Sequence, residues 1–248
     1  MKAQISPVQN PSSAALQFVE SVVALRPQVA VFDCDGTLWE GDSGADFFYW
    51  EIKRGLIPQA IAQWILPRYE AYKAGKVDEE TMCGEMVAIN AGISEKVLEE
   101  AAEEFFSTVV EHRIFAEMQE LTRRLAESGT ELWAVSSTNV WAVAAGVRRF
   151  GIPQERVLAV CVEIQDGLAT EKLIHVPTDE GKAVAIRKHL SASVDACFGN
   201  SIHDAAMLEL SQQPFAIGPT QELKGIAQAK GWKIYWPDFL ASHSIPTS

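Results

Sequence analysis

The most restrictive feature of the sequence is a short apolar run that ends in two closely spaced carboxylates. Val29 to Phe32 follows Pro27 and is stopped by Gly36, which is typical of a buried strand in a parallel sheet. Asp33 and Asp35 follow this strand, and the carboxyl end of a strand is where open α/β sheets bind ligands. Two carboxylates on one side of an extended chain need a cation or a shared proton. The pair indicates a metal site or an acid–base pair, although an Asp-rich turn explains this stretch alone equally well.

Short apolar runs and helical segments alternate along most of the remaining chain. The runs predict strands over residues 131–135, 157–164, 172–176, 195–198, 215–217 and 232–235, with a hairpin turn at Asp166-Gly167. Helical patterns and capping residues predict helices over 12–25, 114–127, 140–150, 178–190, 201–210 and 220–230. Repeated strand–helix units predict an α/β fold, in which a Rossmann-like parallel sheet is covered by helices on both faces.

One block interrupts this alternation. Four helices without an intervening strand are expected over residues 44–54, 58–74, 78–90 and 94–110, separated by Gly55, Gly75 and Gly92. We therefore predict an all-helical insertion over residues 42–112, and a core formed by residues 1–41 and 113–248.

Charge and cysteine usage limit the partners that the chain is expected to have. The net charge of −12 opposes binding to nucleic acid or to an anionic membrane. No apolar run is long enough to span a bilayer, and the N-terminus lacks the apolar segment of a signal peptide. The four scattered cysteines form no CxxC pair and are typical of a reducing compartment. The expectation is a cytoplasmic protein with a small-molecule partner, while its oligomeric state is left open.

Three later segments supply polar residues that can join the two carboxylates at one edge of the sheet. Ser136 follows the apolar run 132–135, Lys182 lies in the first turn of the helix after Thr178, and 199–204 carries Asn200 and Asp204. Each has an ordinary structural explanation, such as a strand end, a solvated lysine or a capping box. A cation in the first turn opposes the helix dipole, however, so an anion is expected beside Lys182.

The order and spacing of these residues resembles the haloacid dehalogenase superfamily, and within it the phosphoserine-phosphatase-like phosphatases. Phe32-Asp-Cys-Asp-Gly-Thr-Leu38 matches the DxDGT motif, Val135-Ser136 matches the second motif, Lys182 the third, and 198–204 resembles the fourth. The fourth motif usually begins with Asp, and here Asn200 takes that position. The resemblance covers residues 29–217 and implies that the helical insertion is a C1-type cap.

The resemblance also implies a phosphatase mechanism. Asp33 would attack phosphorus and form an aspartyl-phosphate, while Asp35 would protonate the leaving alkoxide and later deprotonate the hydrolytic water. The hydroxyls of Thr37 and Ser136, together with the Lys182 ammonium, would hold the phosphate oxygens.

Mg²⁺ is the cofactor that the resemblance implies. Its protein ligands would be a carboxylate oxygen of Asp33, the backbone carbonyl of Asp35 and the side chain of Asn200, with Asp204 holding water molecules that are bound to the ion. Because the carboxamide of Asn200 brings no charge, weaker metal binding is expected than with a carboxylate at this position.

The substrate is expected to be a small phosphorylated metabolite. Asp42 lies near the position where phosphoserine phosphatases bind the substrate ammonium, but Met82-Cys83-Gly84 stands where their cap arginine would be. Phosphoserine is therefore not favoured. The cap is rich in aromatic residues, most of them expected in its core, and aromatics with one carboxylate would suit a quaternary ammonium such as phosphocholine. Alternatives are a phosphotransferase, or a non-catalytic phospho-ligand-binding protein or receiver-like switch.

Overall fold

The computed structural model describes residues 10–243, and within them one sheet holds seven strands in the order β4-β3-β2-β1-β5-β6-β7. The strands are β1 Val29–Phe32, β2 Glu131–Asn139, β3 Val157–Gln165, β4 Leu168–His175, β5 Val194–Gly199, β6 Ser211–Ile217 and β7 Lys233–Tyr235. All neighbouring strands are parallel except β3 and β4, which form an antiparallel hairpin. The predicted α/β class is confirmed, with this edge hairpin as the exception to a parallel sheet.

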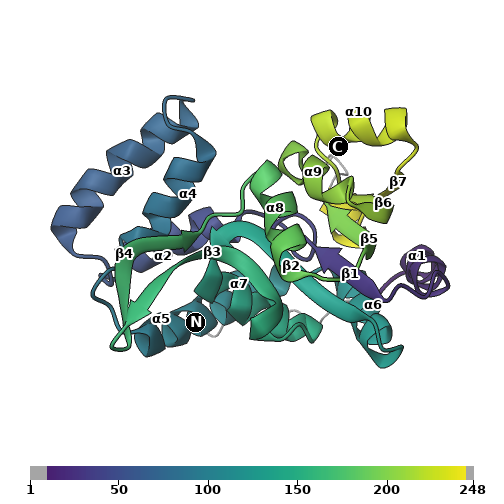
Figure 1. Ribbon diagram of the computed structural model, residues 1–248, viewed down its shortest axis with the longest axis horizontal. Helices are drawn as coiled ribbons and strands as arrows, with labels where there is room; N and C mark the ends of the chain where they lie inside the picture. Colours follow the sequence, from purple (N-terminus) through teal and green to yellow (C-terminus); the bar gives the residue numbers. More distant parts are fainter. Residues whose placement is uncertain (1–9, 244–248) are drawn as a thin grey trace.

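Helices cover both faces of the sheet, as the strand–helix alternation predicts (Figure 1). The covering helices are α1 Ser13–Val23, α6 Ala116–Glu127, α7 Val140–Val147, α8 Glu180–His189, α9 Ala205–Leu208 and α10 Gln221–Lys230, and α11 Asp238–His243 follows β7. The alternating side chains of β1 separate the two layers. Ala30 and Phe32 pack with α1, α6 and α7, whereas Val29 and Val31 pack with α8, α9 and α10. None of the described helices is long and apolar enough to cross a membrane.

Strand β1 lies in the middle of the sheet, and this placement determines where the site forms. All four of its residues are buried, and it pairs with β2 on one side and β5 on the other. Phe32 is level with Ala134 of β2 and Phe198 of β5, and its ring stacks on Phe198 at 4.4 Å between centroids. The segments that follow these three strands therefore meet at one edge of the sheet.

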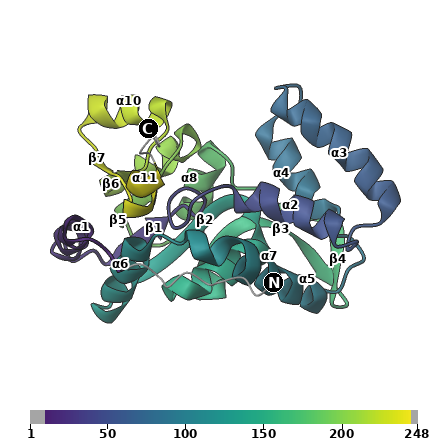
Figure 2. The same cartoon turned by 180° about the vertical axis from the view of Figure 1, so that it is seen from behind.

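The segment between β1 and α6 is helical, as predicted. It contains α2 Ser43–Lys53, α3 Gln59–Lys73, α4 Glu79–Ala88 and α5 Glu95–Phe105, followed by a π-helical turn at Phe106–Val110 and a 3₁₀ turn at Glu111–Arg113. Figures 1 and 2 show the α3–α4 pair at the end of the molecule opposite α10. The assignment of residues 42–112 as a domain of its own stays a prediction.

Two hydrophobic clusters divide this helical segment. Phe47 of α2 and Phe105 of α5 belong to the cluster that underlies the sheet, whereas Phe48, Ile65 and Met82 form a separate cluster between α2, α3 and α4. The β3–β4 hairpin supports α4 and the loop after it, since the Gly92 amide donates to the Ala169 carbonyl at 2.8 Å. Among the described helices, α3 and α4 thus share with α2 a cluster distinct from that of the sheet, although Val87 of α4 still packs in the sheet cluster.

Some element boundaries differ from those expected. Strand β2 continues to Asn139 instead of ending at Val135, with a register shift against β3 between these two residues. Helix α8 begins at Glu180, and its N-cap position is occupied by Asp179 in a positive-φ conformation (φ 45°), not by Thr178. Side-chain contacts made by neighbouring elements override local propensity at such ends.

Candidate active site

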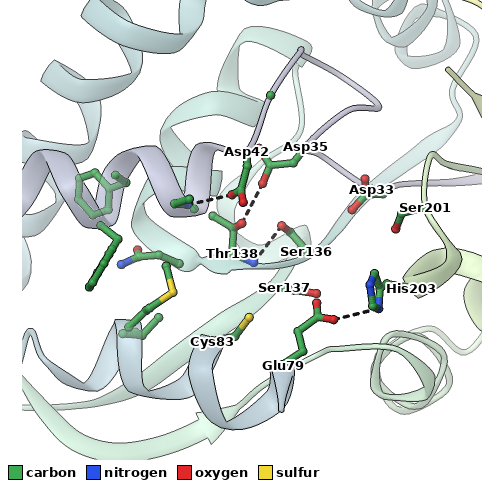
Figure 3. Close-up of a pocket in the computed structure, with 18 of the residues that line it drawn as sticks. Asp33, Asp35, Asp42, Glu79, Cys83, Ser136, Ser137, Thr138, Ser201 and His203 are labelled. Atoms are coloured by element: carbon green, nitrogen blue, oxygen red, sulfur yellow. Dashed lines mark hydrogen bonds and ion pairs between the residues drawn. The ribbon is translucent and has the colours of Figure 1, made fainter. Parts of the chain in front are cut away.

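A cavity of about 300 Å³ lies at the carboxyl edge of the sheet, between the strand ends and helices α2 and α4 (Figure 3). Six residues predicted to form the site line it, namely Asp33, Asp35, Asp42, Ser136, Lys182 and Asn200. The other two, Thr37 and Asp204, are fully buried behind its wall. The structure therefore brings all the predicted residues to one place, although they come from five separate segments.

Asp33 and Lys182 form a buried ion pair at the base of the cavity. Nζ of Lys182 donates to Oδ1 of Asp33 at 2.8 Å and to Oδ1 of Asp204 at 2.6 Å. The hydroxyl of Thr37 donates to Oδ2 of Asp33 at 2.9 Å, and the Asp33 amide donates to the carbonyl of Phe198. The Thr37 hydroxyl thus holds the Asp33 carboxylate in place, while its expected contact with a phosphate oxygen stays a prediction.

Burial and charge perturb the two members of this pair. Burial raises the pKa of Asp33 above its ordinary value, and the Asp204 carboxylate adds to the rise, while Lys182 opposes it. Burial lowers the pKa of Lys182, but the carboxylates of Asp204 and Asp33 outweigh it and hold the pKa above its ordinary value. Lys182 therefore stays protonated, and a single cation faces two buried carboxylates.

Asp204 holds both the lysine and the loop after β5. Its Oδ2 accepts from the amides of Asn200 and Ser201 at 2.8 and 2.9 Å, and the capping box with Ser201 is present. A Cβ at Gly199 would lie 2.6 Å from the Cβ of Asp204, so only glycine permits this approach. The two oxygens of Asp204 thus accept hydrogen bonds from Lys182 and from the loop, while its expected role in holding waters of a metal ion stays a prediction.

Asp35 is oriented by three donors. Its Oδ1 accepts from the Trp39 indole and from the Ser43 amide, each at 2.7 Å, and its Oδ2 accepts from the Thr138 hydroxyl at 2.8 Å. Thr138 also places its amide 3.1 Å from Oγ of Ser136, which accepts that bond and keeps its own proton available. Thr138 was not predicted, although it lies two residues after Ser136.

A metal ion fits the donors around the turn at Gly36. This glycine has φ 74°, and a Cβ there would lie 1.9 Å from Nδ2 of Asn200, so the Asn200 side chain lies directly against the turn that carries Asp33 and Asp35. No hydrogen bond to the Asn200 side chain is made within residues 10–241. Carboxylate, carbonyl and carboxamide oxygens are ligands that Mg²⁺ accepts, and the surplus of carboxylates favours a cation.

Asp42 lies between the acidic turn and helix α2. It is the N-cap of α2, where its Oδ1 accepts from the Ala45 amide at 2.8 Å. Burial raises the pKa of Asp42 to about 6, with a further contribution from the Asp35 charge. Its second oxygen leaves it able to contact a ligand in the cavity.

Helices α2, α3 and α4 contribute an apolar wall with little positive charge. Phe47, Phe48, Tyr69 and Tyr72 line the cavity, whereas Tyr49, Trp50 and Trp64 of the same helices do not. No arginine of the described chain lines it either. Arg54 pairs with Glu104 at the surface, and Arg68 pairs with the partly buried Glu85. A substrate carboxylate would thus meet no arginine among the described residues that line the cavity.

His203 joins helix α4 to the segment before α8 at the rim of the cavity. Its Nδ1 lies 2.9 Å from Oε2 of Glu79 in α4 and 2.6 Å from Oδ1 of Asp179 before α8. The hydrogen bonds to Glu79 and Asp179 raise the pKa of His203 to about 9, against partial burial. Sequence reasoning assigned His203 no role, because nothing in the sequence relates positions 79, 179 and 203.

Comparison with known proteins gives one family and several relatives. The model of the haloacid dehalogenase-like hydrolase family matches residues 30–209. A putative hydrolase of Mycobacterium leprae is 26% identical over 85% of this chain and 75% of its own length. The phosphoserine phosphatase SerB1 of Mycobacterium tuberculosis is 26% identical over 83% and 69%, and a histidinol-phosphatase of Neisseria meningitidis is 27% identical over 83% and 97%.

Solved structures share the fold. A protein of unknown function from Bordetella pertussis Tohama I superposes with a TM-score of 0.73, at 26% identity over 84% of this chain and 97% of that one. A substrate-bound phosphoserine phosphatase superposes with a TM-score of 0.54, at 15% identity over 87% and 95%. At that identity the second likeness concerns the fold alone.

Proposed function

Because this chain belongs to the haloacid dehalogenase-like hydrolase family, we propose that it is a Mg²⁺-dependent phosphatase that hydrolyses a small phosphomonoester through an aspartyl-phosphate. The observation that carries the proposal is the buried pair of Asp33 and Lys182 at the base of an open cavity, with Asp35 on the same turn. A phosphate dianion repels a carboxylate nucleophile, so a fixed cation beside the nucleophile is what this reaction requires.

The reaction proceeds in two displacements on phosphorus. An oxygen of Asp33 attacks, the phosphorus–oxygen bond to the alcohol breaks, and Asp35 gives its proton to the departing alkoxide. Asp35 then takes a proton from water, which attacks the aspartyl-phosphate and releases inorganic phosphate and Asp33. Thr37 orients Asp33, Asp204 orients Lys182, and the free hydroxyl proton of Ser136 is available to a phosphate oxygen.

Asp33, the carbonyl of Asp35 and Asn200 would hold Mg²⁺. When bound, this ion would neutralise part of the charge on the phosphate and on the acidic turn. Asn200 supplies an oxygen without a charge, so we expect weaker metal affinity than a carboxylate would give at this position.

The substrate we propose carries an amino or ammonium group. Asp42 offers a carboxylate oxygen to such a group, and the neighbouring aromatic wall suits phosphocholine or a related phosphate. The absence of a lining arginine in the described chain weighs against phosphoserine. The names of two relatives add phosphoserine and histidinol phosphate as compounds to assay. The cytoplasmic location and the exclusion of nucleic acid and membrane partners stay predictions.

A screen of phosphorylated metabolites tests the proposal. Inorganic phosphate is measured with and without Mg²⁺ for the wild-type protein and for Asp33→Asn, which we expect to lose at least about 10³-fold in turnover. The matched control is Asp195→Asn at the opposite end of the sheet, where the carboxylate accepts from the amides of Gln28 and Val29. Undiminished turnover in Asp33→Asn would refute the mechanism.

A phosphotransferase would share the same intermediate but pass the phosphoryl group to an alcohol. Repeating the assay with added acceptor alcohols and identifying the products separates the two activities. A non-catalytic phospho-ligand-binding protein would release no phosphate from any of the compounds.

A further inference from the structure

Glu51 is a carboxyl buried in the wall of the cavity, beside Asn90, and neither of its oxygens has a donor in good hydrogen-bond geometry among the described residues. Its exposed fraction is 0%, and it lines the cavity. Nearby, Oδ1 of Asn90 is also buried without a partner, while its Nδ2 donates to the carbonyl of Val87 at 3.3 Å. The Asn90 amide interacts with Glu51 but donates its hydrogen bond to Val87, so the Glu51 carboxyl lacks a well-placed donor of its own in the described chain.

An arrangement of this kind is costly unless a ligand completes it. Buried polar groups are nearly always paired, and an unpaired buried carboxyl loses its solvation without compensation. Burial raises the pKa of Glu51 well above its ordinary value, against a smaller opposing effect of the Asn90 amide. Without a ligand the neutral form is therefore favoured, and a cation that donates N–H groups would restore the charged form.

Glu51 lies far along the cavity from the phosphate-binding end. Gly44, Phe47, Phe48 and Glu51 occupy one face of α2 and all line the cavity. At Gly44 helix α2 lies against Thr138, the residue whose hydroxyl donates to Asp35. A Cβ at Gly44 would lie 2.7 Å from Oγ1 of Thr138. Seven residues at about 1.5 Å each place Glu51 about 10 Å further along the helix axis.

We propose that Glu51 is the specificity residue that receives an N–H-bearing cationic group at the end of the substrate remote from the phosphate. The inference rests on the proposed phosphatase function and sharpens its substrate class. Because Glu51 lies about 10 Å along the helix from Gly44, the phosphate and the nitrogen are separated by several bonds of extended chain. The segment between them passes the rings of Phe47 and Phe48, so it is apolar.

This assignment differs from one that uses Asp42. Asp42 borders the acidic turn and already caps α2, so it can serve only a short substrate such as phosphoethanolamine. A quaternary ammonium carries no N–H group and would leave both oxygens of Glu51 unpaired. The length of the substrate and the presence of N–H groups on its cation are therefore the two properties that show whether Glu51 or Asp42 binds that cation.

The test uses wild-type protein and three matched series with Mg²⁺: aminoalkyl phosphates from 2-aminoethyl to 8-aminooctyl phosphate, the alkyl phosphates of equal length, and the trimethylammonium counterparts. We expect kcat/KM for the amines to peak at an intermediate length, about tenfold or more above both the alkyl and the trimethylammonium compound of that length. A peak at 2-aminoethyl phosphate, or equal values for the three series, would overturn the proposal.

Two variants test whether Glu51 is the residue that causes the preference for amines. In Glu51→Gln the ratio of kcat/KM between the best amine and its alkyl counterpart is expected to fall at least about fivefold, because the amide nitrogen repels the ammonium. Glu117→Gln is the control, since Glu117 is equally buried but accepts from Tyr235 and from the Asp238 amide away from the cavity. That control keeps the wild-type ratio. A retained ratio in Glu51→Gln would show that Glu51 is only a neutral core residue.

Failure of this inference differs from failure of the proposed function. If p-nitrophenyl phosphate and every compound of the series release no phosphate, the phosphatase assignment itself is wrong. If they are hydrolysed without an amine preference at any length, only the assignment of Glu51 is wrong. Should Glu51→Gln not fold, as judged by circular dichroism, the wild-type series decides alone.

Discussion

The two ends of the cavity are built in opposite ways. At the sheet edge the reactive side chains are held by hydrogen bonds from within the chain, since Lys182 donates to both Asp33 and Asp204, and three donors orient Asp35. At the other end Glu51 is equally buried, and neither of its oxygens has a donor in good hydrogen-bond geometry among the described residues. A matched network holds reactive groups in place before a substrate arrives. A buried carboxyl without a donor can instead be stabilised by a ligand that supplies one. The end with Asp33 and Lys182 therefore suits catalysis, and the end with Glu51 suits the selection of a substrate.

The largest expected effect comes from removing the cation at the sheet edge. Lys182→Met leaves Asp33 and Asp204 as two buried carboxylates without a partner, which we expect to cost about 3–5 kcal/mol in the free energy of unfolding. Urea denaturation measures this loss, and phosphate release should fall below detection. Lys172→Met is the control, because Lys172 pairs with Glu163 at the exposed surface and should change stability by less than about 1 kcal/mol. Equal stabilities for the two variants would contradict the matched network.

A second effect concerns the turn between the two catalytic carboxylates. Gly36→Ala adds a Cβ 1.9 Å from Nδ2 of Asn200 at a residue with φ 74°, so the turn and Asn200 must move apart. We expect kcat to fall about 10²-fold, as displacements near 1 Å do. Gly129→Ala has a comparable φ of 86° but meets open space, so it tests the backbone strain alone. If both variants lose the same activity, strain and not the position of Asn200 is responsible.

Metal affinity gives a third, smaller effect at the same end. Asn200→Asp adds a charged oxygen next to the acidic turn, and we expect Mg²⁺ to bind about tenfold more tightly, or about 1.4 kcal/mol. The Mg²⁺ dependence of phosphate release and isothermal titration calorimetry measure the change. Unchanged affinity would mean that residue 200 does not contact the ion.

The smallest expected effect tests the contact that joins the two ends. Since the pKa of His203 is raised, its pairs with Glu79 and Asp179 stabilise the fold fully below the ordinary histidine pKa near 6.5, and this contribution disappears as pH rises through about 9. Because His203 is nearly half exposed, the contribution should stay below about 1 kcal/mol. His203→Gln should therefore lower Tm by a few degrees at pH 6 and leave it unchanged above pH 10. A difference in Tm that is independent of pH would exclude an ion-pair origin.

The difference between the sheet-edge end of the cavity and the Glu51 end also explains which site residues could be predicted from the sequence. Asp33, Asp35 and Lys182 could be placed at one edge because parallel strands bring their carboxyl ends together, and the motif order fixes which residues meet there. Glu51 and His203 could not be found in this way. Their neighbours are chosen by how α2 and α4 pack on the core, and a buried glutamate on a helix has no sequence signature that separates it from a solvated one.

Element ends were harder to predict than element types for a related reason. Strand β2 extends through Ser136 to Asn139, because pairing with β3 resumes at Asn139 after a register shift. Asp179 adopts a positive φ directly before α8, and its carboxylate contacts His203, which lies in the segment after β5. Such contacts between distant segments decide where a strand or helix stops, and local propensity carries no information about them.

The most direct test of the account is whether a phosphoryl group becomes attached to Asp33. Wild-type protein is mixed with Mg²⁺ and a hydrolysed phosphomonoester, quenched in acid within the first turnover, and digested for mass spectrometry. The account predicts a phosphorylated peptide that contains residues 29–38 with the added mass on Asp33, and no such peptide from Asp33→Asn. A label on any other residue, or turnover without a covalent label in a quench fast enough to trap it, would contradict the account.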